Sequence, residues 1–206
     1  MTVPEYLKEI EHAASETLGL AWSERKQLED FEAHLSRLRS QVEDSQRRID
    51  WLNENPEFDD DFQATYMKYE SYFGPEKELY YSGKTTAELQ ELLGIRKFST
   101  GALGGNMLQY GKQAISFVHG KLSICPDGRL IGTQPLKNII WQGRNQALHW
   151  EEGGFTPPVV ACFETLARET NPKFGEFRAR NMATDVLTLL GWKEFADFER
   201  DMLLLS

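Results

Sequence analysis

Residues 28–52 read LEDFEAHLSRLRSQVEDSQRRIDWL, and they set the structure expected for the first third of the chain. Apolar residues recur there at alternating steps of three and four, with Ser45 in the one polar slot; they are Leu28, Phe31, Leu35, Leu38, Val42, Ile49 and Leu52. This heptad spacing predicts a long helix with one apolar seam. We expect it to run from Ser23, as N-cap, to Asn53. The seam suits either packing on its own chain or a coiled coil with a partner.

The segments that follow are also expected to be helical. A second helix is predicted over residues 59–73, and its aromatic stripe should pack against the long helix; the stripe is Phe62, Tyr66, Tyr69 and Phe73. A short third helix is predicted from Thr85 to Leu93, ended by Gly94. We therefore divide the chain into an N-terminal helical and coiled-coil region (1–75), a linker with a short helix (76–99) and a C-terminal helical domain (100–206).

The C-terminal half alternates short helices with turn signals. An apolar helix is expected over 107–118, followed by a hairpin or hairpin-like loop over 121–133 that turns at Pro126-Asp127-Gly128. Further helices are predicted over 134–152, from Pro157 or Pro158 to Glu169, over 174–190 before Gly191, and over 193–205. The predicted fold class is all-α: a long N-terminal helix or coiled-coil hairpin, then a helical bundle with a small hairpin insert.

Composition limits the function. The net charge is −9, which argues against a protein that coats nucleic acid through bulk charge but allows a small basic pocket. Two cysteines, Cys125 and Cys162, lack metal-type spacing and are expected to be free thiols packed in the core. No signal-peptide pattern and no stretch of about 18 apolar residues is present. We expect a cytoplasmic protein.

The main set of reactive groups lies in residues 141–150, WQGRNQALHW, within the helix expected over 134–152. At about 100° per residue, Asn145 and His149 lie about 40° apart on one face, and the long side chain of Arg144 reaches the same face. Arginine binds phosphate, and histidine transfers protons near neutral pH. The spacing predicts a site that holds a phosphate and moves a proton.

The same helix carries two large apolar residues on its reactive face. Trp141 and Leu148 fall between Arg144 and Asn145, whereas the opposite arc suits burial in the chain's own core; that arc comprises Ile139, Ile140, Gly143, Ala147 and Trp150. A fully solvated surface with two such side chains would be unusual. We expect another helix or a second subunit to cover this face, which makes Trp141 and Leu148 candidates for a dimer interface.

Arg-Asn-x-x-x-His within a compact helical domain resembles the HEPN superfamily (higher eukaryotes and prokaryotes nucleotide-binding domain), over about residues 100–205. The resemblance implies an endoribonuclease that needs neither a metal nor another cofactor. It also implies a homodimer with a composite active site, in which the ribose 2′-OH attacks the adjacent phosphate and a 2′,3′-cyclic phosphate forms. His149 would then be the general acid or base, Arg144 would bind the phosphate, and Asn145 would orient either group.

The resemblance also suggests partners and a biological role. RNA would be the substrate, and the protein would act as a toxin or as an abortive-infection effector in antiviral defence. An antitoxin or regulatory protein would bind through the N-terminal helices. Arg178 and Arg180 are candidates for RNA-backbone contacts, and a salt-bridged solvated face is the alternative.

Two other functions remain open on the sequence. One is a non-catalytic helical module for dimerisation and interaction, whose heptad seam binds a protein partner. The other is a helical domain that senses a nucleotide through Arg144.

Overall fold

The computed structural model describes residues 1–59, 62–82 and 86–206. Eight α-helices account for most of these residues, with one two-stranded sheet, so the fold is all-α as predicted. The chain forms two compact units: unit 1 is Met1–Arg25 with Lys97–Ser206, and unit 2 is Lys26–Arg96. Among the described helices, none is long and apolar enough to cross a membrane.

This division differs from the predicted regions 1–75, 76–99 and 100–206. The first 25 residues belong with the C-terminal helices because they carry their own apolar stripe, which is buried in the core of unit 1; it comprises Val3, Tyr6, Leu7, Ala14 and Leu18. Within that core, the Tyr6 hydroxyl donates to the backbone oxygen of Tyr110 at 3.0 Å. Helices α1 and α4 both supply residues to the two units.

Helix α1 (Val3–Glu54) begins twenty residues before the predicted N-cap at Ser23. Its start is fixed by Thr2 and Glu5: the Thr2 backbone N–H donates to Glu5 Oε2 at 2.7 Å, and Glu5 N–H donates to Thr2 Oγ1 at 3.3 Å. The heptad seam is buried or half-buried along its whole length, which agrees with packing on its own chain.

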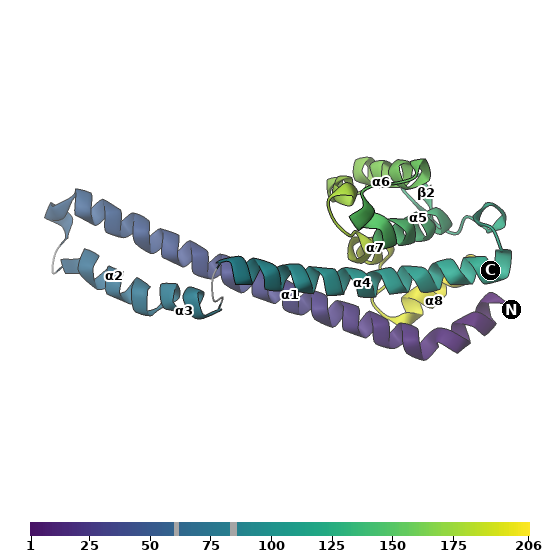
Figure 1. Ribbon diagram of the computed structural model, residues 1–206, viewed down its shortest axis with the longest axis horizontal. Helices are drawn as coiled ribbons and strands as arrows, with labels where there is room; N and C mark the ends of the chain where they lie inside the picture. The colour runs from purple at the N-terminus through teal and green to yellow at the C-terminus, as the bar shows by residue number, and fades with distance from the viewer. Residues whose placement is uncertain (60–61, 83–85) are drawn as a thin grey trace. The chain divides into compact units, whose positions relative to one another are not determined.

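In unit 2, the second part of α1 runs beside η1 (Pro56–Phe58), α2 (Gln63–Phe73) and α3 (Pro75–Ser82) (Figure 1). The predicted packing of the aromatic stripe is wrong: Tyr66 and Tyr69 are 63% and 62% exposed, and Phe62 and Phe73 are exposed as well. Helix α2 instead buries two small residues, Ala64 and Ser71. The helix predicted over 59–73 begins only at Gln63, and its residues 60–61 lie outside the described part.

Helix α4 (Thr86–His119) replaces the short helix and loop predicted between 85 and 105. The predicted first residue, Thr85, lies outside the described residues. The glycines of α4 do not end it: Gly94 lies in open space, whereas Gly104 and Gly111 allow close packing. A Cβ on Gly104 would lie 3.1 Å from the backbone N of Thr184, and one on Gly111 would lie 2.9 Å from Ile140 Cγ2. Any larger residue at either position would push α4 away from α5 or α7.

Between α4 and α5, the chain forms η3 (Leu122–Ile124) and a small antiparallel hairpin of β1 (Leu130–Ile131) and β2 (Gln134–Pro135). The hairpin turns at Gly132, with φ +60°, and not at Pro126-Asp127-Gly128 as predicted. The carbonyls of Asp127 and Arg129 instead accept the N–H groups of Lys137 and Leu136, at 3.4 and 2.9 Å. This segment therefore supplies hydrogen-bond acceptors for backbone N–H groups in the first turn of α5.

The remaining helices of unit 1 are α5 (Leu136–His149), η4 (Trp150–Glu152), α6 (Pro157–Glu169), η5 (Pro172–Arg178), α7 (Ala183–Leu190) and α8 (Phe195–Leu203). Helix α6 has the predicted limits, whereas the helix predicted over 174–190 is split into η5 and α7. Helix α5 contacts both α6 and α7, and all three lie together in Figure 1. Trp192, Phe163 and Phe198 are the largest fully buried side chains of this core.

Candidate functional site on helix α5

Helix α5 has one buried side and one side that is half-buried or exposed. Ile139, Ile140 and Ala147 are buried, as predicted, whereas Trp150 is only half-buried. Gly143 lies where α5 meets α4 and α7, since its Cβ would come within 3.3 Å of Leu108 Cδ1 and Val186 Cγ1. The other side carries the predicted reactive residues. They therefore stand on a helix that the core holds in place.

Arg144 is the half-buried cation of this face. Its Nε donates to Gln109 Oε1 of α4 at 2.6 Å, and its Nη1 donates to Asn145 Oδ1 at 3.2 Å. Both partners are neutral amides, and no carboxylate within residues 1–59, 62–82 and 86–206 forms an ion pair with it. Burial lowers the pKa of the Arg144 guanidinium, although arginine remains charged. The result is an oriented positive charge without a negative partner in the described chain.

Asn145 links Arg144 to the preceding turn. Its Nδ2 donates weakly to Gln142 Oε1 at 3.4 Å while its oxygen accepts from Arg144. In the part of the chain that is described, no hydrogen bond joins Asn145 to His149. The one-turn spacing places them on one face, as predicted, but Asn145 orients Arg144 here and not the histidine.

His149 ends α5 and is paired with a carboxylate, Glu152, that the sequence did not identify as its partner. Its Nδ1 lies 2.8 Å from Glu152 Oε1, and its side chain is 47% exposed. A carboxylate only accepts, so Nδ1 carries the proton in this contact, and Nε2 takes no part in it. The turn η4 brings Glu152 back towards the ring. The spacing of three residues was the available signal for this pair.

The two apolar residues of the reactive face have different surroundings. Trp141 is half-buried against the core, and Lys112 Nζ of α4 lies 4.8 Å from its ring centroid. Leu148 is 50% exposed. Lys112 adds a second positive charge to the face of α4 and α5 that carries Arg144, and the geometry of the pair is that of a cation–π contact.

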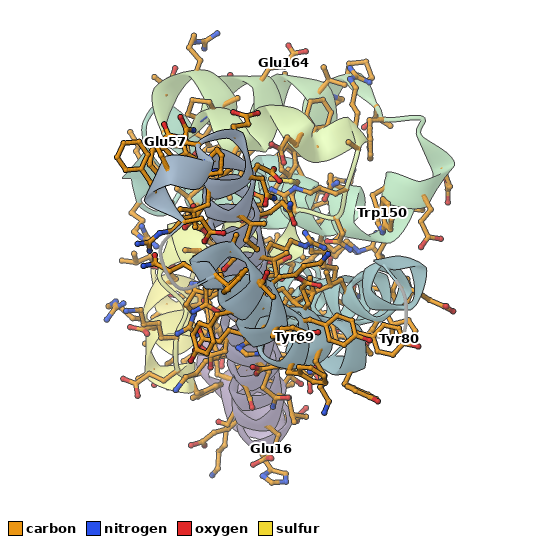
Figure 2. The ribbon with its side chains drawn as sticks, turned by 90° about the vertical axis from the view of Figure 1, so that its left-hand side faces the viewer. Glu16, Glu57, Tyr69, Tyr80, Trp150 and Glu164 are labelled. Carbon is orange, nitrogen blue, oxygen red and sulfur yellow. The ribbon has the colours of Figure 1, made fainter. Side chains whose placement is uncertain are left out.

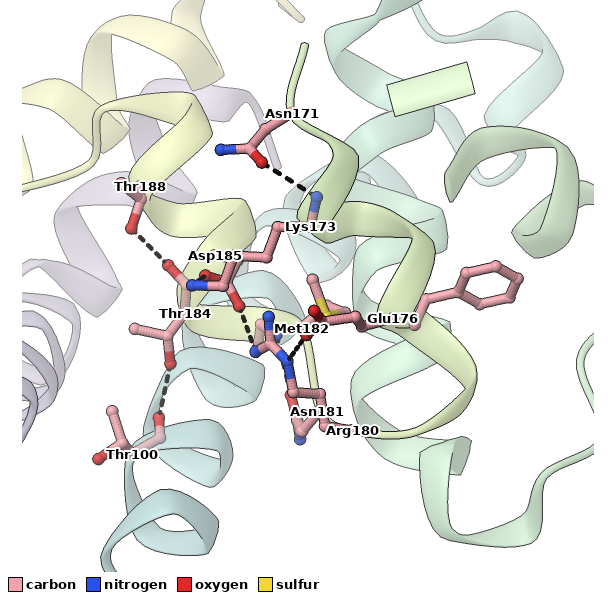
Figure 3. Close-up of polar contacts among 12 residues, drawn as sticks. Thr100, Asn171, Lys173, Glu176, Arg180, Asn181, Met182, Thr184, Asp185 and Thr188 are labelled. Carbon is pink, nitrogen blue, oxygen red and sulfur yellow. Dashed lines mark hydrogen bonds and ion pairs between the residues drawn. The ribbon is translucent and has the colours of Figure 1, made fainter. Parts of the chain in front are cut away.

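Arg178 and Arg180 are not equivalent. Arg180 Nε bonds Glu176 at 2.7 Å and its Nη1 bonds Asp185 at 2.6 Å, so its charge is already balanced (Figure 3). Arg178 is exposed, with its guanidinium carbon 4.8 Å from the ring centroid of Phe177. Of the two candidates for RNA contacts, only Arg178 presents a charge that no described carboxylate balances.

Gln146 lies within the motif but faces the core. It is fully buried; its Nε2 donates to the carbonyls of Phe177 and Arg180, both at 2.8 Å, and its Oε1 accepts the N–H of Met182 at 2.9 Å. Asn181 Nδ2 adds a bond to the carbonyl of Ala147 at 3.1 Å. The motif helix therefore fixes the segment that carries Arg178 and Arg180.

Elsewhere, the described chain offers less chemistry. Cys125 and Cys162 are buried free thiols, as predicted, and burial raises the pKa of both. Within the described residues, no three His, Cys, Asp or Glu side chains come together as metal ligands would. An open hollow of about 420 Å³ in unit 2 is lined by Leu35, Leu93 and charged side chains of both signs, and includes none of the predicted site residues.

Comparison with known proteins gives no further guide, since no family model, no curated protein and no solved structure matches the chain.

Proposed function

We propose that the protein is a metal-independent endoribonuclease of HEPN type, with Arg144, Asn145 and His149 in its active site. The observation that carries the proposal is Arg144: a half-buried guanidinium held by two neutral amides, whose charge no described carboxylate balances. Burying a charge without a counterion is costly, and a phosphate would supply that counterion. His149, whose side chain is half-exposed five residues further along the helix, supplies the proton acceptor.

The reaction follows from these roles. His149 Nε2 takes the proton of the ribose 2′-OH, the 2′ oxygen bonds to phosphorus, and the bond from phosphorus to the 5′ oxygen breaks. The leaving 5′ oxygen takes a proton, and the product is a 2′,3′-cyclic phosphate. Arg144 stabilises the charge that develops on the phosphoryl oxygens. Glu152, bonded to Nδ1, holds the ring and stabilises the imidazolium that forms.

A single His149 cannot be both the base and the acid in one step. We propose that two copies of α5 face each other in a homodimer, so that one His149 accepts a proton while the partner's His149 donates one. The exposure of Leu148 beside the site supports this arrangement, because a second α5 would cover it. A toxin or antiviral effector is the role that suits a nuclease of this kind.

Cleavage of an RNA pool in the presence of a chelator tests the proposal. Wild type should yield 2′,3′-cyclic phosphate ends, and His149→Ala should lose at least about a hundredfold in rate. His12→Ala, at an exposed histidine of α1, is the matched control and should cleave like wild type. Equal cleavage by His149→Ala and wild type would refute the role of His149.

A binding experiment separates this function from a non-catalytic module. Inorganic phosphate should raise the midpoint of thermal unfolding of wild type, because ligand binding stabilises the folded state. Arg144→Gln should abolish that shift, and Arg178→Gln should leave most of it. A protein that neither cleaves RNA nor responds to phosphate through Arg144 would be an interaction module.

A further inference from the structure

Helices α2 and α3 carry an aromatic surface that the chain leaves exposed. It is defined by six side chains, each 61–72% exposed: Tyr66, Tyr69, Tyr72, Phe73, Tyr80 and Tyr81. Five of the six rings contact one another, within α2 and within α3. Tyr69 stacks on Phe73 with centroids 6.3 Å apart, and Tyr80 meets Tyr81 edge to face at 5.3 Å. Figure 2 labels Tyr69 and Tyr80 on this pair of helices.

Exposed aromatic residues on this scale are unusual in a protein without a partner. Tyrosine in particular is enriched at the energetic centres of protein interfaces, because it buries a large area with few rotatable bonds. The helices that carry the rings are fixed within unit 2: Ser71 bonds Glu76 at 2.6 Å, and His34 of α1 lies 3.4 Å from Glu78. The aromatic surface is therefore presented on a supported scaffold.

The charge around the aromatic surface defines its partner. Residues 51–82 contain eight acidic and two basic residues, a net charge of −6 out of −9 for the whole chain. One of these carboxylates bonds a tyrosine of the surface, since the Tyr66 hydroxyl donates to Glu70 Oε1 at 2.9 Å. Nucleic acid would be repelled by this charge. A second copy of the same surface would be repelled as well.

We propose that the aromatic surface is a docking site for an arginine-bearing segment of a partner protein. The guanidinium group stacks on tyrosine faces and pairs with carboxylates through its planar fork, so it matches both features at once. Lysine supplies the charge but not the planar fork. The proposal does not depend on the nuclease function, because all its residues belong to unit 2.

The test uses the full chain and a fluorescently labelled octa-arginine peptide, with binding followed by anisotropy at low salt. The triple variant Tyr66→Ser/Tyr69→Ser/Tyr80→Ser should weaken binding about tenfold, since each exposed cation–π contact contributes modestly. Octa-lysine should bind wild type several-fold more weakly than octa-arginine. The control variant Phe98→Ser/Phe117→Ser removes two exposed rings of unit 1, which are 58% and 60% exposed, and should bind octa-arginine like wild type.

Three results would overturn the proposal. One is unchanged octa-arginine binding by the triple variant, with circular dichroism showing that it is folded. Another is equal weakening by the control variant, which would mean that exposed rings anywhere on the chain bind the peptide. The third is self-association of wild type, measured by sedimentation and lost only in the triple variant, which would make a second copy the occupant.

Discussion

Replacing Gln146 with leucine tests whether the motif helix holds the segment that follows η5. The substitution keeps the side-chain volume nearly constant, so little cavity forms, but it removes three hydrogen bonds at a position that is fully buried. The carbonyls of Phe177 and Arg180 and the N–H of Met182 then lose their partner. Each buried group left unpaired costs about 1–3 kcal/mol, so we expect Gln146→Leu to lower the free energy of unfolding by about 3–5 kcal/mol after some relaxation.

The assay is urea unfolding of the full chain, followed by tryptophan fluorescence and circular dichroism. Gln142→Leu is the matched control on the same helix. Gln142 is also buried, but within the described residues its side chain bonds only the side chains of Asn138 and Asn145, at 3.3 and 3.4 Å. Those side chains are half-buried and can turn to water, so we expect a cost below about 1 kcal/mol. A loss of less than about 1 kcal/mol in Gln146→Leu, or an equal loss in Gln142→Leu, would refute the reasoning.

Three further outcomes are expected. Gly111→Ala should lower the free energy of unfolding by about 1–3 kcal/mol, because its Cβ would lie 2.9 Å from Ile140 Cγ2. The Cβ of Gly94→Ala would meet nothing within 4 Å, so that variant should stabilise the helix, and thermal unfolding measures both effects. The hydrogen bond from the backbone N–H of Lys193 lowers the pKa of Asp197 from its ordinary 3.8. The Asp197 carboxylate therefore stabilises the fold above pH 3.8, and this stabilisation is lost as the pH falls through the lower pKa of the folded state. Asp197→Asn should therefore be less stable than wild type at neutral pH and converge with it in strong acid, as urea midpoints across pH would show. Burial raises the pKa of Cys162 to about 12, so iodoacetamide should label it at mildly alkaline pH only after unfolding, and fast labelling of the native chain would contradict this.

The sequence predicted helices well where the apolar spacing is long and regular. The seam from Leu28 to Leu52 is buried or half-buried, as heptad spacing requires, and Pro157 starts α6 as expected. The errors come from small residues and turn formers. Gly104 falls before the helix predicted over 107–118 and Gly111 within it, but both mark where α4 is closely packed. Whether a glycine allows close helix packing depends on tertiary contacts, and the local sequence does not show those contacts.

For the aromatic stripe of α2, the period was correct and the inference of burial was wrong. Phe62, Tyr66, Tyr69 and Phe73 do recur at helical spacing, but spacing identifies a face and not its surroundings. A helical stripe of two tyrosines and two phenylalanines is more amphipathic than a leucine stripe, because the tyrosine hydroxyl can hydrogen-bond to water. Composition of the stripe was thus the signal that it faces outward.

The candidate site could be predicted in part. The sequence identified Arg144, Asn145 and His149 on one face of one helix, but not the partners that orient them. Gln109 comes from another helix, thirty-five residues away, and no local pattern links it to Arg144. Glu152 was within reach of sequence reasoning, because a carboxylate three residues after a helix-ending histidine can fold back on it.

Within the short motif on α5, substitutions at different positions should have different effects, on stability or on the proposed chemistry. Gln146 faces inward, and its side chain bonds the backbone of unit 1 at three points. His149 is half-exposed, and in the described part of the chain its side chain bonds only Glu152. Substitution of Gln146 should therefore act on stability first, whereas under the proposed function substitution of His149 should slow proton transfer with little effect on folding. Arg144 lies between these extremes: it is half-buried like Arg129 and Arg180, but they are paired with Asp201 and Asp185, and no described carboxylate pairs with it. Leaving a half-buried charge without a counterion is costly. The pairing of Arg144 with two neutral amides is the arrangement expected of a group that must leave its charge available to an anion.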